Sequence, residues 1–159
     1  MTLRKLFAFM ILLFVTSTAP VAGQAPSTAE MEHIMEDLQA SHIRANVPPD
    51  SSFMTLLERD VRAYLVAQRL PSKSVEIELL RKGPTQSGVS YPKYYLWIRA
   101  AEESGPYVEG AMRVAAIERV RFDITDFTSA ASIRSDPASL ASIYPALLAP
   151  AIRRHAGAD

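Results

Sequence analysis

The sequence predicts a single small α+β domain. Three observations support this prediction: apolar residues recur at helical spacing between Ser27 and Leu70, apolar and polar residues alternate from Ser74 onward, and helical spacing returns after Asp136. Helices before and after a run of strands are typical of an antiparallel α+β fold. Removing the 23 N-terminal residues discussed below from the total of 159 leaves 136, an ordinary length for one domain.

Two helices are expected at the start of this domain. The first begins at Ser27, which can form a capping box with Glu30, and it runs to about Ala45 because Pro48 and Pro49 prevent its continuation. Its apolar residues are Met31, Ile34, Met35 and Leu38. Their spacing predicts one apolar face on this helix.

The second helix is expected from Asp50 or Ser51 to about Leu70. Its apolar residues fall on one side: Phe53, Leu57, Val61, Tyr64 and Leu65. Most of its charged residues lie off that side: Glu58, Arg59, Asp60 and Arg62. This pattern predicts a helix that buries one face and exposes the other.

Strands are expected from Ser74 onward. Residues 74–79 alternate between apolar and acidic, which predicts a half-buried strand. Residues 93–101 are rich in aromatic residues with apolar side chains toward both faces, so this strand is expected to be central. The stretch 108–127 is too long for one flat strand, and its pattern shifts near Ile117, where we expect a bulge or bend. The sheet is therefore predicted to have three to four antiparallel strands, the third long and bent.

A C-terminal helix is expected after Asp136, which can cap it ahead of Pro137. Pro145 and Pro150 must kink or split this helix. The resulting element order predicts a compact two-layer α+β domain. A strongly bent sheet wrapped over the two N-terminal helices would form a cone with a cavity, as in cystatin-like or NTF2-like architectures, an analogy of element order alone.

Residues 1–23 have the pattern of a Sec-type signal peptide. Arg4 and Lys5 precede an unbroken apolar run at 6–15, and small residues follow at Ala22 and Gly23, where we expect cleavage. The run is far shorter than the roughly 20 residues that span a bilayer core. We therefore expect no membrane span after cleavage, a single α+β domain over 24–159, and a periplasmic or extracellular location.

Composition excludes several classes of function. The chain has no cysteine, so disulfides, thiolate metal sites, cysteine catalysis and lipidation at the cleavage site are excluded. The signal holds two of the 17 basic residues and none of the 17 acidic ones, which leaves a mature net charge near −2. That balance argues against nucleic-acid binding, which requires a basic surface. No motif indicates a cofactor.

Two short patterns resemble chemical motifs without the rest of the motif. His33 and Asp37 are four residues apart on the first helix, but no third ligand is recognisable, so we interpret them as part of a solvated acidic face and expect no metal site. Ser90 and Lys93 have the SxxK spacing of penicillin-recognising serine enzymes. Pro92 interrupts the helix that this motif requires, and the partner motifs are missing.

Two isolated residues are the only candidates for acid–base chemistry. His42 follows Leu38 by four residues on the apolar side of the first helix, where it is either a hydrogen-bonded core residue or a base in a pocket. Asp126 shares the inward parity of Phe122 and Ile124, so it either marks the exit of the strand or places a carboxylate in a cavity.

The aromatic residues around the central strand are the candidates for binding. This aromatic cluster consists of Tyr91, Tyr94, Tyr95, Trp97 and Tyr107. Most of this cluster is expected to pack within the sheet. Tyrosine and tryptophan also favour recognition surfaces, because each combines a large contact area with a polar group.

Two classes of function therefore remain open. The first is an exported, non-catalytic domain that binds a protein or cell-envelope component through the aromatic sheet and its loops. The second is a bent-sheet cavity protein that binds a small apolar ligand, or performs acid–base chemistry on it, with His42 or Asp126 in the pocket. We favour the first, because catalysis requires convergent polar groups and the sequence shows only isolated ones.

Overall fold

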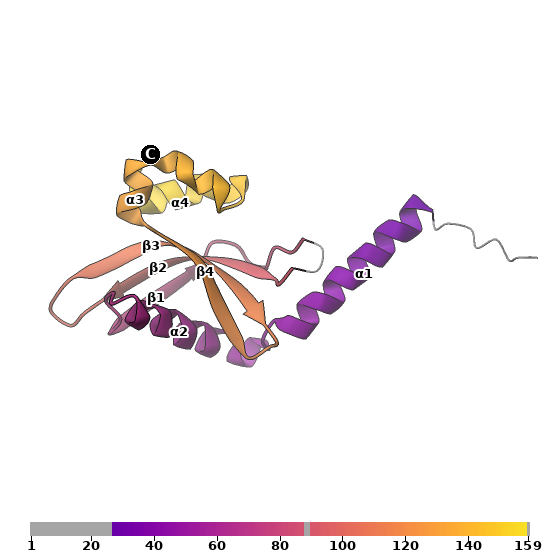
Figure 1. Cartoon of the computed structure of the whole chain (residues 1–159), viewed down its shortest axis with the longest axis horizontal. Coiled ribbons are helices and arrows are strands. Elements are labelled where there is room, and N and C mark those ends of the chain that lie inside the picture. The colour runs from indigo at the N-terminus through magenta and orange to yellow at the C-terminus, as the bar shows by residue number, and fades with distance from the viewer. Residues whose placement is uncertain (1–26, 88–89, 159) are drawn as a thin grey trace, which may run out of the picture.

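The structure, a computed structural model, describes residues 27–87 and 90–158, and the predicted signal peptide lies outside this range. The elements follow the expected order of helices, strands and helices, which confirms the α+β fold class (Figure 1). They are α1 (Thr28–Asn46), α2 (Asp50–Ala67), β1 (Ser74–Leu79), β2 (Lys93–Ala101), β3 (Tyr107–Ile117), β4 (Arg121–Ser129), α3 (Ala130–Ser135), the 3-10 turns η1 (Pro137–Ser142) and η2 (Ala146–Leu148), and α4 (Ala149–Ala156).

The four strands form one antiparallel sheet in the order β1-β2-β3-β4. Successive side chains along a strand point to opposite faces of the sheet, and the register decides which of them stand side by side on neighbouring strands. Ile77, Ile98 and Gly110 stand opposite one another on one face, and Glu78, Trp97 and Ala111 on the other. Both faces of β2 are buried, as expected for the central aromatic strand.

Helix α2 covers the first face of the sheet. Its buried side chains Leu57, Val61 and Leu65 pack into a core formed with apolar residues of all four strands. The buried sheet residues of this core are Tyr94, Leu96, Ile98, Ala100, Met112, Val114, Ala116 and Phe122. The apolar stripe read from the sequence of the second helix is therefore its packing face.

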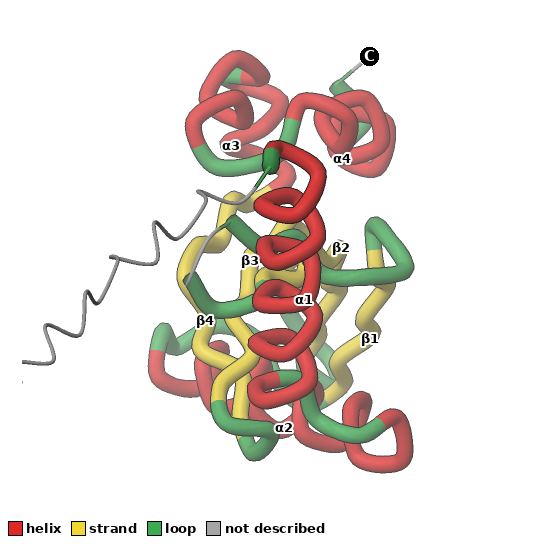
Figure 2. Tube along the Cα trace, turned by 90° about the vertical axis from the view of Figure 1, so that its right-hand side faces the viewer, coloured by secondary structure: helices red, strands yellow, loops and turns green. Residues whose placement is uncertain are grey.

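The C-terminal segment covers the second face, which makes the domain three-layered rather than two-layered. Figures 1 and 2 show α3 and α4 on one side of the sheet and α2 on the other. Ile133, Leu140 and Ile152 pack on this face against Tyr95 and Trp97. Because the C-terminal helices bury an aromatic face that the two-layer prediction left free, the sheet has a core on each side.

Prolines divide the C-terminal segment into short pieces, as expected. The Asp136 carboxylate accepts a hydrogen bond from the Ala138 amide at 3.2 Å, ahead of η1, and Pro150 stands in the first turn of α4. The short helix α3, which directly follows β4, was not predicted. Ser129 caps it by accepting a hydrogen bond from the Ser132 amide at 3.2 Å.

The expected bend near Ile117 is a tight hairpin turn between β3 and β4. Glu118 and Arg119 have φ angles of 51° and 64°, the pattern of the primed turns that suit hairpins. The sequence lacks the asparagine–glycine signal of such turns, so its alternation alone predicts one long, bent strand. The bulge lies elsewhere, between Arg113 and Val114.

Helix α1 covers neither face of the sheet. It is joined to the domain at its C-terminal end and projects away from it (Figure 1). Asn46 is 5% exposed; its side-chain oxygen accepts from the Glu118 amide at 3.1 Å, and its backbone carbonyl accepts from the Arg119 amide at 2.8 Å. The sheet is therefore not wrapped over both N-terminal helices, as the cone analogy would require, because of the two only α2 packs against it.

Candidate functional site

The aromatic residues predicted to bind a partner are distributed over both faces and both ends of the sheet. Tyr94 is buried against α2, whereas Tyr95 and Trp97 are buried under the C-terminal segment. Tyr91 and Tyr107 are 44% and 71% exposed. They lie near opposite ends of the nine-residue strand β2, roughly 30 Å apart. The structure does not bring these five side chains together on one surface.

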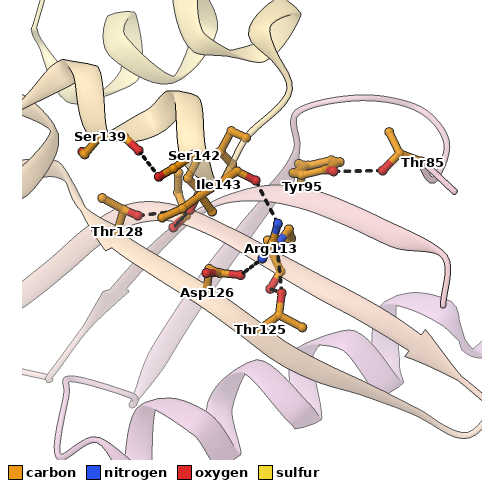
Figure 3. A network of polar contacts seen from close by, with 11 residues as sticks. Thr85, Tyr95, Arg113, Thr125, Asp126, Thr128, Ser139, Ser142 and Ile143 are labelled. Carbon is orange, nitrogen blue, oxygen red and sulfur yellow. Dashed lines mark hydrogen bonds and ion pairs between the residues drawn. The ribbon is translucent and has the colours of Figure 1, made fainter. Parts of the chain in front are cut away.

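The buried aromatic residues have packing partners. The Tyr94 ring meets Phe53 edge-on with centroids 4.9 Å apart, and the Trp97 ring stacks on His155 at 5.1 Å. The Tyr95 hydroxyl is 2.9 Å from the Thr85 hydroxyl (Figure 3). These contacts are typical of a sheet core, where aromatic pairs add stability beyond their buried area.

Asp126 is engaged in a polar network between the sheet and the C-terminal segment. Its carboxylate pairs with the Arg113 guanidinium, which also donates to the Ile143 carbonyl and to the Thr125 hydroxyl, both at 3.0 Å (Figure 3). Both side chains of the pair are 23% exposed. Through these contacts the network connects the sheet, next to the β-bulge, to the C-terminal segment that covers it.

Tyr144 strengthens the same junction. Its hydroxyl donates to the Ala111 carbonyl at 2.8 Å, and burial raises the pKa of this phenol to about 12. The Tyr144 hydroxyl therefore stays protonated, and able to donate this hydrogen bond, at pH values well above the physiological range.

His42 lies apart from Asp126, near the junction of α1 with the domain. Its ring stands 6.2 Å from the Tyr91 ring at an interplanar angle of 26°, and its Nε2 atom is buried without a hydrogen-bond partner among the described residues. Its backbone carbonyl accepts from the Asn46 amide group at 2.9 Å. The two candidate acid–base residues thus have separate surroundings.

No group of three or more histidine, aspartate or glutamate side chains that could hold a metal ion occurs in the described part of the chain. His33 and Asp37 are 3.8 Å apart, and both side chains are 75% exposed. Across 27–87 and 90–158, no helix is both long enough and apolar enough to span a membrane.

Three shallow hollows on the described surface are lined by neither His42 nor Asp126. The largest of these, about 450 Å³, lies between α2 and β4, where Asp60 accepts from the Phe122 amide at 2.7 Å. Two smaller ones, about 160 and 220 Å³, lie over β1 and β2 beside Arg99. Arg121 and Asp123 also line the largest hollow, where they pair with each other at 3.6 Å.

The most distinctive surface lies on α1. We call it the α1 stripe, defined by Met31, Ile34, Met35 and Leu38, which are 51%, 49%, 43% and 59% exposed. A rotation of 100° per residue places all four within an arc of about 100°. The other exposed large apolar side chains are distributed over α2, the start of β3, η2 and the loops: Met54, Val66, Tyr91, Tyr107, Val120 and Leu147. Only α1 gathers several of them on one face of a single described element.

Carboxylates flank the α1 stripe on both sides. By the same helical rotation, Glu32 and Glu36 lie along one side, and Glu30 and Asp37 along the other. Arg44 is the single Lys or Arg of the helix, which leaves four carboxylates against one cation, a net charge of −3 with histidines neutral. The surface is an apolar ridge with two acidic borders.

Helix α1 is capped at its N-terminus and attached to the rest of the domain at its C-terminus. At the N-terminus the Ser27 amide and hydroxyl donate to the Glu30 carboxylate at 2.7 and 2.8 Å, and the Glu30 amide donates back to the Ser27 hydroxyl at 3.3 Å. These bonds lower the pKa of Glu30 and keep it charged. At the C-terminus Asn46 attaches the helix to the hairpin turn.

The sequence predicts the apolar residues of the α1 stripe as one face of the first helix, but not what that face contacts. The signal that distinguishes this helix is its charge: carboxylates border the apolar residues on both sides, whereas α2 carries both signs. Comparison with known proteins adds no assignment, because the chain matches no protein-family model, no curated protein and no solved structure.

Proposed function

We propose that this chain is an exported, non-catalytic binding or adaptor domain that contacts a protein or cell-envelope component through the α1 stripe. The observation that carries the proposal is the exposure of four neighbouring apolar side chains on a helix that projects from the domain. Large, contiguous, exposed apolar patches on a protein are typical of sites that bind another molecule.

The size of the α1 stripe suits a binding role. Four half-exposed side chains present on the order of 400 Å² of apolar surface, comparable to the largest patch on a typical monomer. Burying this area contributes roughly 10 kcal/mol before the cost of association, which is itself about 4–15 kcal/mol. The apolar ridge alone therefore supports weak binding, and a specific partner must also contact its borders.

The α1 helix is also ordered in the absence of a partner. The capping box and the Asn46 attachment order the helix in the free protein. Since a preordered element loses less conformational entropy on binding, more of the buried area contributes to affinity. Methionines at two of the four positions let the ridge adapt to the shape of its partner.

The contact is tested by site-specific photo-crosslinking in the cells that produce the protein. A photoreactive residue at position 34 is expected to form an adduct with one predominant partner, identified by mass spectrometry. The matched control is position 33, whose side chain is 75% exposed on the far side of the same helix. Equal labelling at both positions, or no adduct at position 34, refutes a role for the α1 stripe.

Export is tested separately by determining the N-terminus of the protein recovered from the periplasm or medium. Cleavage after Gly23 or Ala22 gives a chain that begins at Gln24 or Gly23. A chain that keeps Met1 and remains in the cytoplasm contradicts the proposed location.

A further inference from the structure

We propose that the partner of the α1 stripe is a basic amphipathic segment, an apolar helical ridge bordered on both sides by lysine or arginine. This inference rests on the proposed function and adds the chemistry of the partner to it. It follows from the acidic borders of the ridge, Glu30 and Asp37 on one side and Glu32 and Glu36 on the other.

These carboxylates have few opposing cations of their own. Among the described residues, His33 lies 3.8 Å from Asp37, and both side chains are 75% exposed. Glu30 is bonded to Ser27 and retains its charge. The borders are therefore anionic and solvated, and a partner with cations at the same positions gains attraction and a faster encounter rate.

A second copy of this chain fits the same surface poorly. Pairing two α1 ridges would place eight carboxylates along one seam, four from each helix, with one arginine from each. Like charges at the borders of a helix pair oppose association, and such repulsion is a common device against self-pairing. The charge pattern therefore disfavours a homodimer through α1.

An anionic lipid surface is disfavoured for the same reason. Helices that lie on membranes carry lysine and arginine on their polar face, which the negative surface potential attracts. Helix α1 carries the opposite sign, a net charge of −3.

The geometry of α1 sets the length of the partner segment. From Met31 to Leu38 the helix rises roughly 10 Å, and the ring of His42, one turn further on, ends the ridge against Tyr91. A partner helix of two to three turns matches this length. Its cations must stand on both sides of its apolar ridge, the arrangement of the e and g positions in a helix pair.

The test uses the mature chain and two synthetic helical peptides of equal length. Both peptides carry leucine on the ridge; one has lysine and the other glutamate at the border positions.

Three variants of the chain are compared with the parent. The stripe variant carries Ile34→Gln with Leu38→Gln. The border variant carries Glu32→Gln, Glu36→Gln and Asp37→Asn, with Glu30 kept for the capping box, and the control is Val66→Gln. Val66 is 60% exposed on α2 and matches Leu38 at 59%.

We expect the parent to bind the lysine peptide at least tenfold more tightly than the glutamate peptide at low salt, with the difference shrinking as salt is added. The stripe variant should lose at least tenfold in affinity for the lysine peptide, the border variant should bind both peptides within about threefold of each other, and the control should match the parent. Circular dichroism and urea unfolding of each variant verify that its fold is retained.

Equal binding of the two peptides, no binding of the lysine peptide, or a preference that survives in the border variant refutes the inference. Dimerisation of the parent that the stripe variant abolishes identifies a second copy as the occupant and also refutes it. Binding of the parent to anionic vesicles through the α1 stripe does so as well. An in-cell adduct at position 34 with a protein lacking a basic segment would refute this inference and leave the proposed function standing.

Discussion

Replacing Asn46 with alanine tests how α1 is attached to the domain. The Asn46 side chain is 5% exposed; it donates to the His42 carbonyl at 2.9 Å and accepts from the Glu118 amide at 3.1 Å. That amide belongs to a turn in which Glu118 and Arg119 both have positive φ angles, a conformation that costs about 1 kcal/mol or more for each non-glycine residue. Asn46 stabilises this turn from the end of α1.

Asn46→Ala should lower the free energy of unfolding by about 2 kcal/mol. The loss combines two side-chain hydrogen bonds with the desolvation cost of a part-buried amide left without a partner. In urea, a change of that size moves the unfolding midpoint by about 1 M, given the slopes typical of small domains. Hydrogen exchange should accelerate at the amides of Glu118 and Arg119, which contact Asn46, before it changes in the sheet.

The matched control is Ser41→Ala, an exposed substitution on the same helix that should stay within about 0.5 kcal/mol of the parent. Asn46→Asp keeps an acceptor for the Glu118 amide, but it buries a negative charge at the end of the helix and turns an acceptor toward the His42 carbonyl, so it should cost at least as much as Asn46→Ala. An Asn46→Ala variant as stable as the control, with unchanged exchange in the turn, would show that α1 is attached by other contacts.

Three further predictions concern the domain. Arg113→Met should cost about 2–3 kcal/mol, because it leaves the Asp126 carboxylate unpaired, and adding Asp126→Leu should restore at least 1 kcal/mol; a double variant no more stable than the single one contradicts this. Burial raises the pKa of both Tyr94 and Tyr144 to about 12, so unfolding favours their ionisation above pH 10; stability should fall between pH 10 and 12 by up to about 3 kcal/mol per tyrosine, and Tyr144→Phe should flatten that dependence in pH-resolved urea titrations. Arg119→Gly should stabilise the domain by about 0.5–1 kcal/mol, because glycine adopts positive φ without strain; a lower unfolding midpoint would indicate that the arginine side chain has a stabilising contact.

The fold class and most element boundaries follow from local signals in the sequence. The capping box at Ser27 starts α1, alternation marks β1, and Asp136 caps η1, each at the expected place. These signals involve residues within four positions of one another, so they do not depend on tertiary contacts. The predicted signal peptide lies outside the described residues and remains a prediction.

The number of layers could not be predicted in the same way. The apolar pattern of the C-terminal segment shows that it buries one side, but not which face of the sheet receives it. The hairpin was hidden for a different reason: Glu118 and Arg119 are unusual residues for a primed turn, and Asn46, 72 residues from Glu118 in the chain, helps hold them. Long-range support of this kind leaves no local trace in the sequence.

The placement of α1 is the most instructive difference, because its apolar pattern resembles that of α2. The polar side chains distinguish the two helices. On α2, Asp60 accepts from the Phe122 amide at 2.7 Å and Arg59 donates to the Val120 carbonyl at 2.9 Å, so charges beside the apolar face bond to neighbouring elements. On α1, the polar contacts described for Glu30 and Asp37 stay within the N-terminal part of the helix.

This contrast gives a physical reason to assign the α1 stripe to a partner. A helix that packs within its own domain benefits when its border residues bond to the elements beside it, because burial would otherwise leave them without water. The borders of α1 keep their water and their charge in the free protein. Under the proposal, cations of the partner lie beside Glu32, Glu36 and Asp37 when the α1 stripe is covered.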